Sequence, residues 1–422
     1  MEDENFLTDD FLRQLIDVGE ADILVGLPTH NNAKSIGSMV LTIRNALLRG
    51  FPRERAVIIN ADGGSRDGTR ELVTGLSISD VRPAPSVYAL RTLHAISTKY
   101  ASIPQGGVAL RTILAAAELL RAKACIVISP ESESVTAEWI SSLLRPVYYE
   151  GFDLVSPTYC RHKFDGLLTT NLLYPMVRAL YGARIREAYM SEFGFSGRLG
   201  SQFLGQNQWN DGIGEHGTEL RLTLAAVTGG FRICQSFLGK KDPVERRAAD
   251  LVPTLRQSVG VLFSALESDF DVWSTISGSQ EVPATGKDLE ILLEPLRVNR
   301  KRLREMFVKG VSELGSVFQS ILSPSTLAEL NRIAGLGEEE FRYPAELWVR
   351  TVYEFAAAHR QSVISRDHII QALAPLFRGR VFTFIVENRS GSANDVANNI
   401  EGLCLEFERL KPYLLDIWKS KE

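Results

Sequence analysis

The chain has 422 residues, of which 45% are hydrophobic and 23% charged, and these are ordinary proportions for a globular protein of two or three domains. Its formal net charge of −4 gives no reason to expect nucleic acid or an anionic membrane as a partner. Residues 1–5 are acidic, unlike a signal peptide, and no apolar run approaches membrane-spanning length, so we expect a cytoplasmic protein without a transmembrane segment.

Residues 1–20 are predicted to form a short helical extension that docks onto the body through apolar side chains, namely Phe11, Leu12, Leu15 and Ile16. A βαβ unit follows between residues 23 and 69. Its parts are a strand at 23–27, a helix at 33–49, a second strand at 56–59 and an acidic turn at 60–69. Open α/β sheets bind ligands at the carboxyl ends of such strands.

The acidic turn suits a nucleotide, because Asp62 can accept ribose or base hydrogens while Gly63 and Gly64 let the backbone approach closely. The same kind of turn is common in βαβ units that bind nothing, so both interpretations stay open here. The sequence lacks the G-x-G-x-x-G motif of dinucleotide-binding folds and the G-x-x-x-x-G-K-S/T motif of P-loops, so neither kind of site is supported.

Further elements are predicted along the chain in order. Residues 86–93 form a strand, and Gly106 and Gly107 open a helix whose free N–H groups suit an anion, although a plain turn and cap is the alternative. The strand at 125–128 ends in a loop that carries Glu131 and Glu133. Acids after a central strand suit a divalent cation; an exposed acidic helix N-terminus is the alternative.

The next strand, at 153–155, leads to three basic-capable residues at 161–163, which suit an acidic acceptor or form a solvated loop. We predict a helix at 167–183, a loop entering a strand at 192–196, a helix at 220–228 and a strand at 231–237. From Val244 the periodicity is mainly helical. One apolar stripe there, at 4-3-4-3-4 spacing, is either intramolecular core or a dimer seam: Val396, Ile400, Leu403, Phe407, Leu410 and Leu414.

Four cysteines lie far apart without C-x-x-C spacing, and three of them sit inside apolar runs. We therefore predict buried free thiols rather than disulfides or a zinc site, at Cys125, Cys160, Cys234 and Cys404.

Seven motifs occur in a consistent order: 27–31 (LPTHN), 62–69 (DGGSRDGT), 104–111 (PQGGVALR), 134–140 (SVTAEWI), 161–166 (RHKFDG), 192–196 (EFGFS) and 230–234 (GFRIC). Together they resemble the GT-A glycosyltransferases of the glucosylglycerate and glucosyl-3-phosphoglycerate (mannosylglycerate-type) synthase family, relatives of the family-2 glycosyltransferases. The resemblance covers roughly residues 20–245.

The resemblance implies an α/β fold with a mixed, Rossmann-like GT-A sheet domain at 21–245 and an all-α domain at 246–422. It implies a retaining transfer of a hexose from a nucleoside-diphosphate sugar to a small acidic acceptor like glycerate, with Mg²⁺ or Mn²⁺. It also implies a homodimer or a paralogous partner.

Residue roles are carried over from the same resemblance. The donor nucleotide would be bound by Pro28, Thr29, Asn31, Asp62, Ser65, Gly106 and Gly107. The acceptor would be bound by Arg161, Lys163 and Thr169, and the donor phosphates by Lys241. Glu219 and Glu131 would be catalytic, with Glu131 and Glu133 as metal ligands.

Three family positions are occupied by other residues in this chain. Ser129 stands at the first Asp of the D-x-D motif, Gly106 at a diphosphate-binding Lys, and Pro243 at a metal-binding His. These changes remove much of the charge that stabilises a departing diphosphate. Two hypotheses follow: an active glycosyltransferase with an altered donor site, or an inactive relative that binds nucleotide sugar or supports an active paralogue. A nucleotidyltransferase would need a Gly-rich signature that is absent near the first strand.

Overall fold

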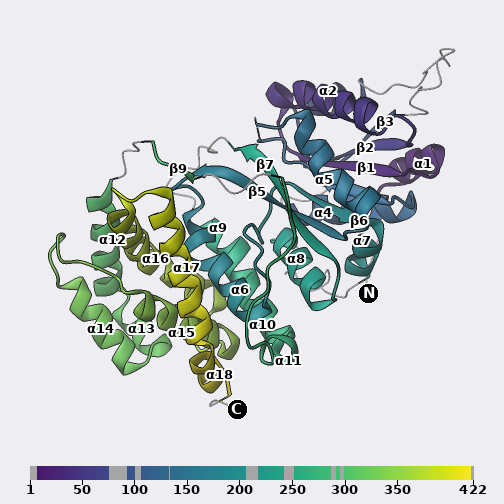
Figure 1. Ribbon diagram of the computed structural model, residues 1–422. Helices are drawn as coiled ribbons and strands as arrows, with labels where there is room; N and C mark the ends of the chain where they lie inside the picture. The colour runs from purple at the N-terminus through teal and green to yellow at the C-terminus, as the bar shows by residue number, and fades with distance from the viewer. Residues whose placement is uncertain are drawn as a thin grey trace. The chain divides into compact units, whose positions relative to one another are not determined.

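The computed structural model describes residues 7–75, 93–99, 106–132, 134–205, 217–241, 251–286, 291–294 and 299–419 (Figure 1). The chain forms two compact units. The first comprises Met1–Tyr159, Tyr189–Val244 and Val282–Leu289, and the second Cys160–Ala188, Glu245–Glu281 and Glu290–Glu422. Compared with the predicted boundary after residue 245, residues 160–188 group with the helical unit and residues 282–289 with the sheet unit.

A mixed β-sheet forms the centre of the first unit. Its strands are β1 (Ile23–Thr29), β2 (Ala56–Asp62), β3 (Leu93–Lys99), β4 (Ala124–Val127), β5 (Leu154–His162), β6 (Phe193–Ser196), β7 (Ile233–Lys240) and β8 (Ala284–Thr285). Across the described residues the order is β3-β2-β1-β4-β6-β5-β7-β8, and a short strand β9 (Ile291–Leu292) pairs with β5. β1 runs parallel to β2 and β4, whereas β6 is antiparallel to β4 and β5.

Helices cover both faces of this sheet, because successive side chains of each buried strand point to opposite sides. α2 (Ala33–Gly50), α3 (Thr69–Thr74) and α5 (Ala137–Glu150) pack on one face, and α1 (Asp9–Val18), α4 (Gly106–Leu119), α7 (Gly197–Leu204) and α8 (Thr218–Thr228) on the other (Figure 1). Gly194 of β6 permits this packing, since a Cβ there would lie 2.4 Å from the Leu143 carbonyl oxygen of α5. The three-layer arrangement confirms the predicted fold class.

Two details of the sheet unit differ from the sequence-based expectation. The third strand lies at Leu93–Lys99 rather than 86–93, and residues 86–92 lie outside the described residues. In α1, Phe11 and Leu15 are buried as predicted, with Leu12 packed against the same core, but Ile16 is 77% exposed. Ile16 falls on the outer face because a helix of this length presents one narrow stripe to the body.

The second unit is mainly helical, as predicted. Its elements are a π-helical turn (Thr169–Leu173), α6 (Tyr174–Tyr181), α9 (Leu251–Leu255), a π-helical turn (Arg256–Gly260), α10 (Val261–Ser268), α11 (Phe270–Trp273), α12 (Arg300–Glu313), α13 (Gly315–Ile321), α14 (Pro324–Ala334), α15 (Ala345–Gln361), α16 (Arg366–Asn388), α17 (Ala393–Arg409) and α18 (Lys411–Lys419).

The apolar stripe of the last two helices is intramolecular core. Val396, Ile400 and Cys404 pack against Tyr174 and Phe384 inside the second unit. This structure therefore supports the core alternative over the dimer seam.

One helix of the second unit is long and apolar enough to cross a membrane by length and composition alone. This is α16, with a mean hydropathy of 1.5 over its best stretch, 83% of which is buried. The expectation that no apolar run approaches membrane-spanning length is therefore wrong for α16. A buried core helix meets the same criteria, because packing favours apolar residues all round it.

All four cysteines are free and buried, which confirms the prediction. Burial raises the pKa of the Cys234 and Cys404 thiols to about 12, so both stay protonated at neutral pH and are poor nucleophiles.

Candidate functional site

The topological switch point of the sheet lies between β1 and β4. From β1 the chain moves to β2 and β3 on one side, and it then returns to form β4 on the other side of β1. The loops that follow β1 and β4 leave in different directions at the carboxyl edge, which is where open α/β sheets bind ligands. Ser35 at the start of α2 donates from its hydroxyl to the carbonyl of Pro130 at 3.0 Å, which ties the two sides together.

Asp62, the predicted nucleoside contact, is fully buried at the end of β2. Its Oδ2 accepts from the backbone N–H groups of Gly64 at 3.0 Å and Ser65 at 2.9 Å. Its Oδ1 accepts from the Ser65 hydroxyl at 2.5 Å and lies 3.0 Å from the Thr29 hydroxyl. In this structure the carboxylate has no exposed surface and holds its own loop in shape, and its direct contact with a ribose stays a prediction.

The loops after β1 and β2 are joined by a second carboxylate, Asp67. Its Oδ2 accepts from the N–H of Ala33 at 2.9 Å, and its Oδ1 accepts from the hydroxyl of Thr69 at 2.6 Å. These bonds, the Thr69 hydroxyl first, lower the pKa of Asp67. Asp67 therefore occupies the N-terminus of α2, where a ligand anion would otherwise be favoured.

The other donor residues predicted from this region surround the same loops. Thr29 is buried and Pro28 is partly buried within β1. Asn31 is exposed and adopts a left-handed backbone with φ 56°, and its N–H donates to the Ser65 hydroxyl at 2.8 Å. Asn31 and Ser65 therefore present a rigid, partly exposed rim at the switch point.

Gly107 and Glu219 come from the opposite face of the sheet. Each stands in the first turn of a helix that leads into a strand, α4 into β4 and α8 into β7. Such helices begin at the carboxyl edge of the sheet, so both residues lie at that edge together with Gly106. Burial raises the pKa of the Glu219 carboxyl above its ordinary value.

Replacing Glu219 by Gln is expected to raise the melting temperature at pH 7–8 and to leave it unchanged near pH 4. A carboxyl whose folded pKa is raised contributes stability below its unfolded pKa and loses that contribution as the pH rises through the folded value. Glutamine cannot ionise and so escapes the penalty. Thermal melts of both proteins across this pH range measure the effect; an equal difference at every pH would contradict it.

Of the two acidic residues predicted to hold a metal, Glu131 and Glu133, the structure describes Glu131. Glu131 is exposed, and its N–H donates to the Ser129 hydroxyl at 3.4 Å. Glu133 and Pro243 lie outside the described residues. No group of three acidic, His or Cys residues that could hold a metal occurs among the residues that were described. By residue type, Ser129 and Pro243 cannot supply the Asp and the His of the cation clamp that the resemblance implies.

A buried ion pair lies at the same edge and was not predicted. Lys241, expected at the donor phosphates, donates from Nζ to Glu192 Oε2 at 2.7 Å, and the hydroxyl of Tyr159 donates to the same oxygen at 2.5 Å. The side chains of Lys241 and Glu192 are 9% and 0% exposed. The sequence shows only a Lys after one strand and a Glu before another; nothing in their spacing indicates that the strands bring them together.

The predicted acceptor residues lie in the second unit. Arg161 forms an ion pair with Glu187 at 3.2 Å, and Thr169 begins the π-helical turn. Lys163 donates from Nζ to the carbonyls of Asn388 at 2.9 Å and Arg389 at 3.0 Å, at the end of α16. The Lys163 ammonium therefore caps the last carbonyls of a helix in this structure, and its contact with an acceptor stays a prediction.

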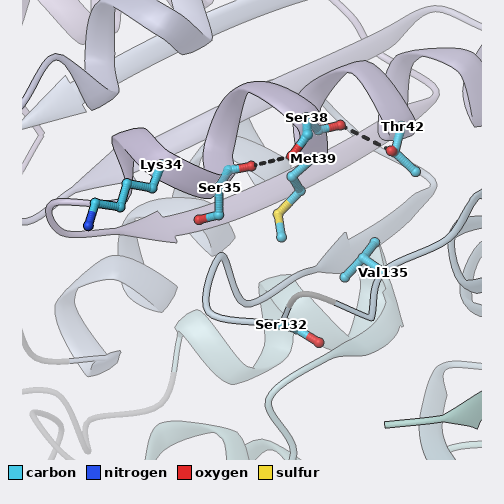
Figure 2. A pocket seen from close by; sticks show the side chains of 7 residues that line it. All are labelled: Lys34, Ser35, Ser38, Met39, Thr42, Ser132 and Val135. Atoms are coloured by element: carbon cyan, nitrogen blue, oxygen red, sulfur yellow. Dashed lines mark hydrogen bonds between the residues drawn. The ribbon is translucent and has the colours of Figure 1, made fainter. Parts of the chain in front are cut away.

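A cavity of about 280 Å³ lies between α2 and the loop before α5. Figure 2 shows its lining, with Lys34, Ser35, Ser38, Met39 and Thr42 from α2 and Ser132 and Val135 from the loop. The hydroxyls of Ser38 and Thr42 donate to helix carbonyls, so they offer only lone pairs to a ligand. Sequence reasoning did not identify this cavity, because its residues are ordinary polar positions of a surface helix.

Comparison with known proteins gives similarities of structure only. No protein-family model matches the chain, and no curated protein matches it by sequence. Glucosyl-3-phosphoglycerate synthase from Mycobacterium tuberculosis, solved with Mn²⁺, UDP and phosphoglyceric acid, is 21% identical with a TM-score of 0.41, over 61% of this chain and 82% of that one. Mannosyl-3-phosphoglycerate synthase from Rubrobacter xylanophilus is 15% identical with a TM-score of 0.43, over 61% and 77%. A mycobacterial protein is 19% identical with a TM-score of 0.43, over 60% and 77%.

Proposed function

We propose that this chain is a glycosyltransferase that moves a hexose from a nucleoside-diphosphate sugar to a small acidic acceptor of the glycerate type, with retention of configuration. The observation that carries the proposal is the sheet order β3-β2-β1-β4-β6-β5-β7, in which β6 runs antiparallel to both of its neighbours, β4 and β5. This order places four of the seven ordered motifs at one carboxyl edge: the loops after β1, β2 and β4 and the residue before β6. Ligand binding at that edge follows from the topology.

The donor would lie along the rim formed by Asn31 and Ser65, with the first turn of α4 facing its anionic groups. Gly107 is buried there and has no side chain to block close approach of a phosphate. Retention requires the acceptor hydroxyl to attack from the face that the diphosphate leaves. Glu219, with its raised pKa, is the group we assign to the acceptor hydroxyl and its proton.

Acceptor binding is assigned to Arg161 and Thr169 of the second unit. A guanidinium suits this task, because its planar donors match a carboxylate or phosphate in two places. Arg161 is 22% exposed and packs close to Gly166, where a Cβ would lie 2.9 Å from its Nη1.

Turnover is expected in an assay for released nucleoside diphosphate with UDP-glucose, GDP-glucose or GDP-mannose as donor and D-glycerate or 3-phosphoglycerate as acceptor. Glu219→Gln should lower kcat by about 10²–10⁴-fold, the usual contribution of a general acid or base. Reactions without acceptor measure simple hydrolysis. No release with any pair, together with no nucleotide binding by calorimetry, would end the proposal.

The second candidate is a non-catalytic protein that binds nucleotide sugar or supports an active paralogue. It is favoured by Ser129 and Pro243, which stand where the family has a metal-binding Asp and a metal-binding His. Nucleotide binding without turnover for every donor and acceptor, and a co-purifying homologous subunit, would select this candidate over the first.

A further inference from the structure

The Glu192–Lys241 pair stands beside the strand end at which the resemblance places a metal. β6 pairs with β4 so that Phe193 lies opposite Val127. Continuing this register by one residue puts Glu192 beside Ile128, directly before the Ser129–Glu131 turn. The pair therefore lies at the carboxyl edge of the sheet, with Glu192 directly before β6 and Lys241 directly after β7.

The pair is held by an aromatic wall. The Lys241 ammonium lies 4.5 Å from the ring centroid of Tyr159 and 3.5 Å from its hydroxyl. Tyr159 in turn contacts Trp139 in the first turn of α5, with their ring centroids 5.5 Å apart. Cation–π contact and a buried carboxylate fix the ammonium in one place, so it does not behave as a flexible surface lysine.

One oxygen of this buried cluster has no partner. Glu192 Oε2 accepts from Lys241 and Tyr159, whereas Oε1 accepts no hydrogen bond from the residues described and has no exposed surface. A buried carboxylate oxygen without a donor is destabilising, and a hydroxyl donor from a ligand or a water molecule would satisfy it.

The charges of the pair match those of the clamp it would replace. A divalent cation held by two carboxylates has a net charge of zero, and one ammonium held by one carboxylate has the same net charge. The pair therefore offers a fixed positive centre to a diphosphate without adding charge to the edge. The Lys241 ammonium supplies a positive charge at this place without a metal ion. It would also repel a metal ion placed beside it.

We propose that Lys241 takes the place of the divalent cation at the donor diphosphate, and that Glu192 Oε1 accepts a hydrogen bond from a hydroxyl of the adjacent hexose. The inference rests on the proposed function. A glycosyl diphosphate is the ligand class with both features side by side, an anionic diphosphate for the ammonium and a hydroxyl donor for the carboxylate. Donor binding by this chain is then independent of divalent cations.

Calorimetric titration with UDP and UDP-glucose tests the cation part directly. Both affinities are expected to agree within about threefold between buffer with 5 mM EDTA and buffer with excess Mg²⁺ or Mn²⁺. Loss of binding in EDTA with recovery on adding Mn²⁺ would overturn the inference and leave the proposed function standing. No binding under either condition would overturn both.

Substitutions of Lys241 and Glu192 test their two proposed contacts separately. Lys241→Met should lower affinity for UDP and UDP-glucose by at least about tenfold, as expected for a lost charge-assisted contact. Glu192→Gln should lower affinity for UDP-glucose by about tenfold while affinity for UDP is unchanged or higher, because the ammonium loses its competitor. A purely structural role for Glu192 would move both ligands together, and that outcome would overturn the hydroxyl contact.

Two further proteins control for folding. Lys240→Met changes the exposed lysine next in the chain and should leave both affinities unchanged. If Lys241→Met melts early because Glu192 is left as an unpaired buried charge, the double variant Glu192→Gln with Lys241→Met restores folding and still fails to bind UDP. Full UDP affinity in that folded double variant would overturn the role of Lys241.

Discussion

Replacing Arg178 by Met is expected to lower the free energy of unfolding by about 3 kcal/mol, the lower end of the range for breaking a buried ion pair. The guanidinium is fully buried in the second unit. It donates to Glu401 at 2.6 and 2.8 Å and to Glu408 at 2.8 Å, and thereby joins α6 to α17. Methionine fills much of the volume but leaves both carboxylates without their cation. Chemical denaturation measures the difference.

The pH dependence and a matched control identify the cause. Hydrogen bonding by Arg178 lowers the pKa of Glu401, so the contribution of this pair is present above the unfolded pKa of Glu401 and is lost as the pH falls through the folded value. Lys309→Met removes an exposed pair with Glu313, 3.7 Å apart, and should change stability by less than about 1 kcal/mol. Equal losses of unfolding free energy in the two variants would show that the buried Arg178 ion pairs stabilise the protein no more than an exposed pair does.

Local patterns sufficed for much of the fold. β1, α2 and β2 were predictable because an apolar strand, a 3.6-residue stripe and a second apolar strand each follow one rule, and the polar residues after them mark the carboxyl edge. The strand at 93–99 was not predicted because it includes His94, Ser97 and Thr98, which do not form an apolar run. Ser97 is buried because it accepts from Asn60 Nδ2 at 2.9 Å, and only the neighbouring strand supplies that partner.

The candidate site was less predictable, because the role of a charged residue depends on partners far away in the sequence. Lys163 looked free for an acceptor, but its ammonium meets carbonyls more than 220 positions later. Lys241 was predicted as a phosphate contact, but its bond to Glu192, 49 positions earlier, could not be predicted from the spacing. A sequence motif indicates which residues lie at the carboxyl edge of the sheet. Which of these residues bind to one another is determined by the register of the strands.

Substitutions of Asp62 distinguish the two roles considered for its carboxylate, a direct nucleoside contact and the organisation of its own loop. If the carboxylate organises its own loop, Asp62→Ala should cost about 3 kcal/mol of stability, because the N–H groups of Gly64 and Ser65 and the hydroxyl of Ser65 lose their acceptor in a buried place. Asp62→Asn should cost only about 1 kcal/mol. The amide oxygen can face the N–H groups of Gly64 and Ser65, and the amide NH₂ can donate to the Thr29 and Ser65 hydroxyls, which are able to accept.

In that case UDP affinity depends on the conformation of the loop after β2 and not on the negative charge of Asp62. Asp62→Asn should keep UDP affinity within about threefold, since Asn31 and Ser65 stay in place, whereas Asp62→Ala should lose at least about tenfold as the rim shifts. A direct contact between the carboxylate and the nucleoside makes the opposite prediction, a large loss of affinity in Asp62→Asn with little change in melting temperature. Calorimetry and thermal melts on the same two variants decide between these alternatives. If Asp62 organises the loop, affinity and stability fall together; if it contacts the nucleoside directly, affinity falls without a loss of stability.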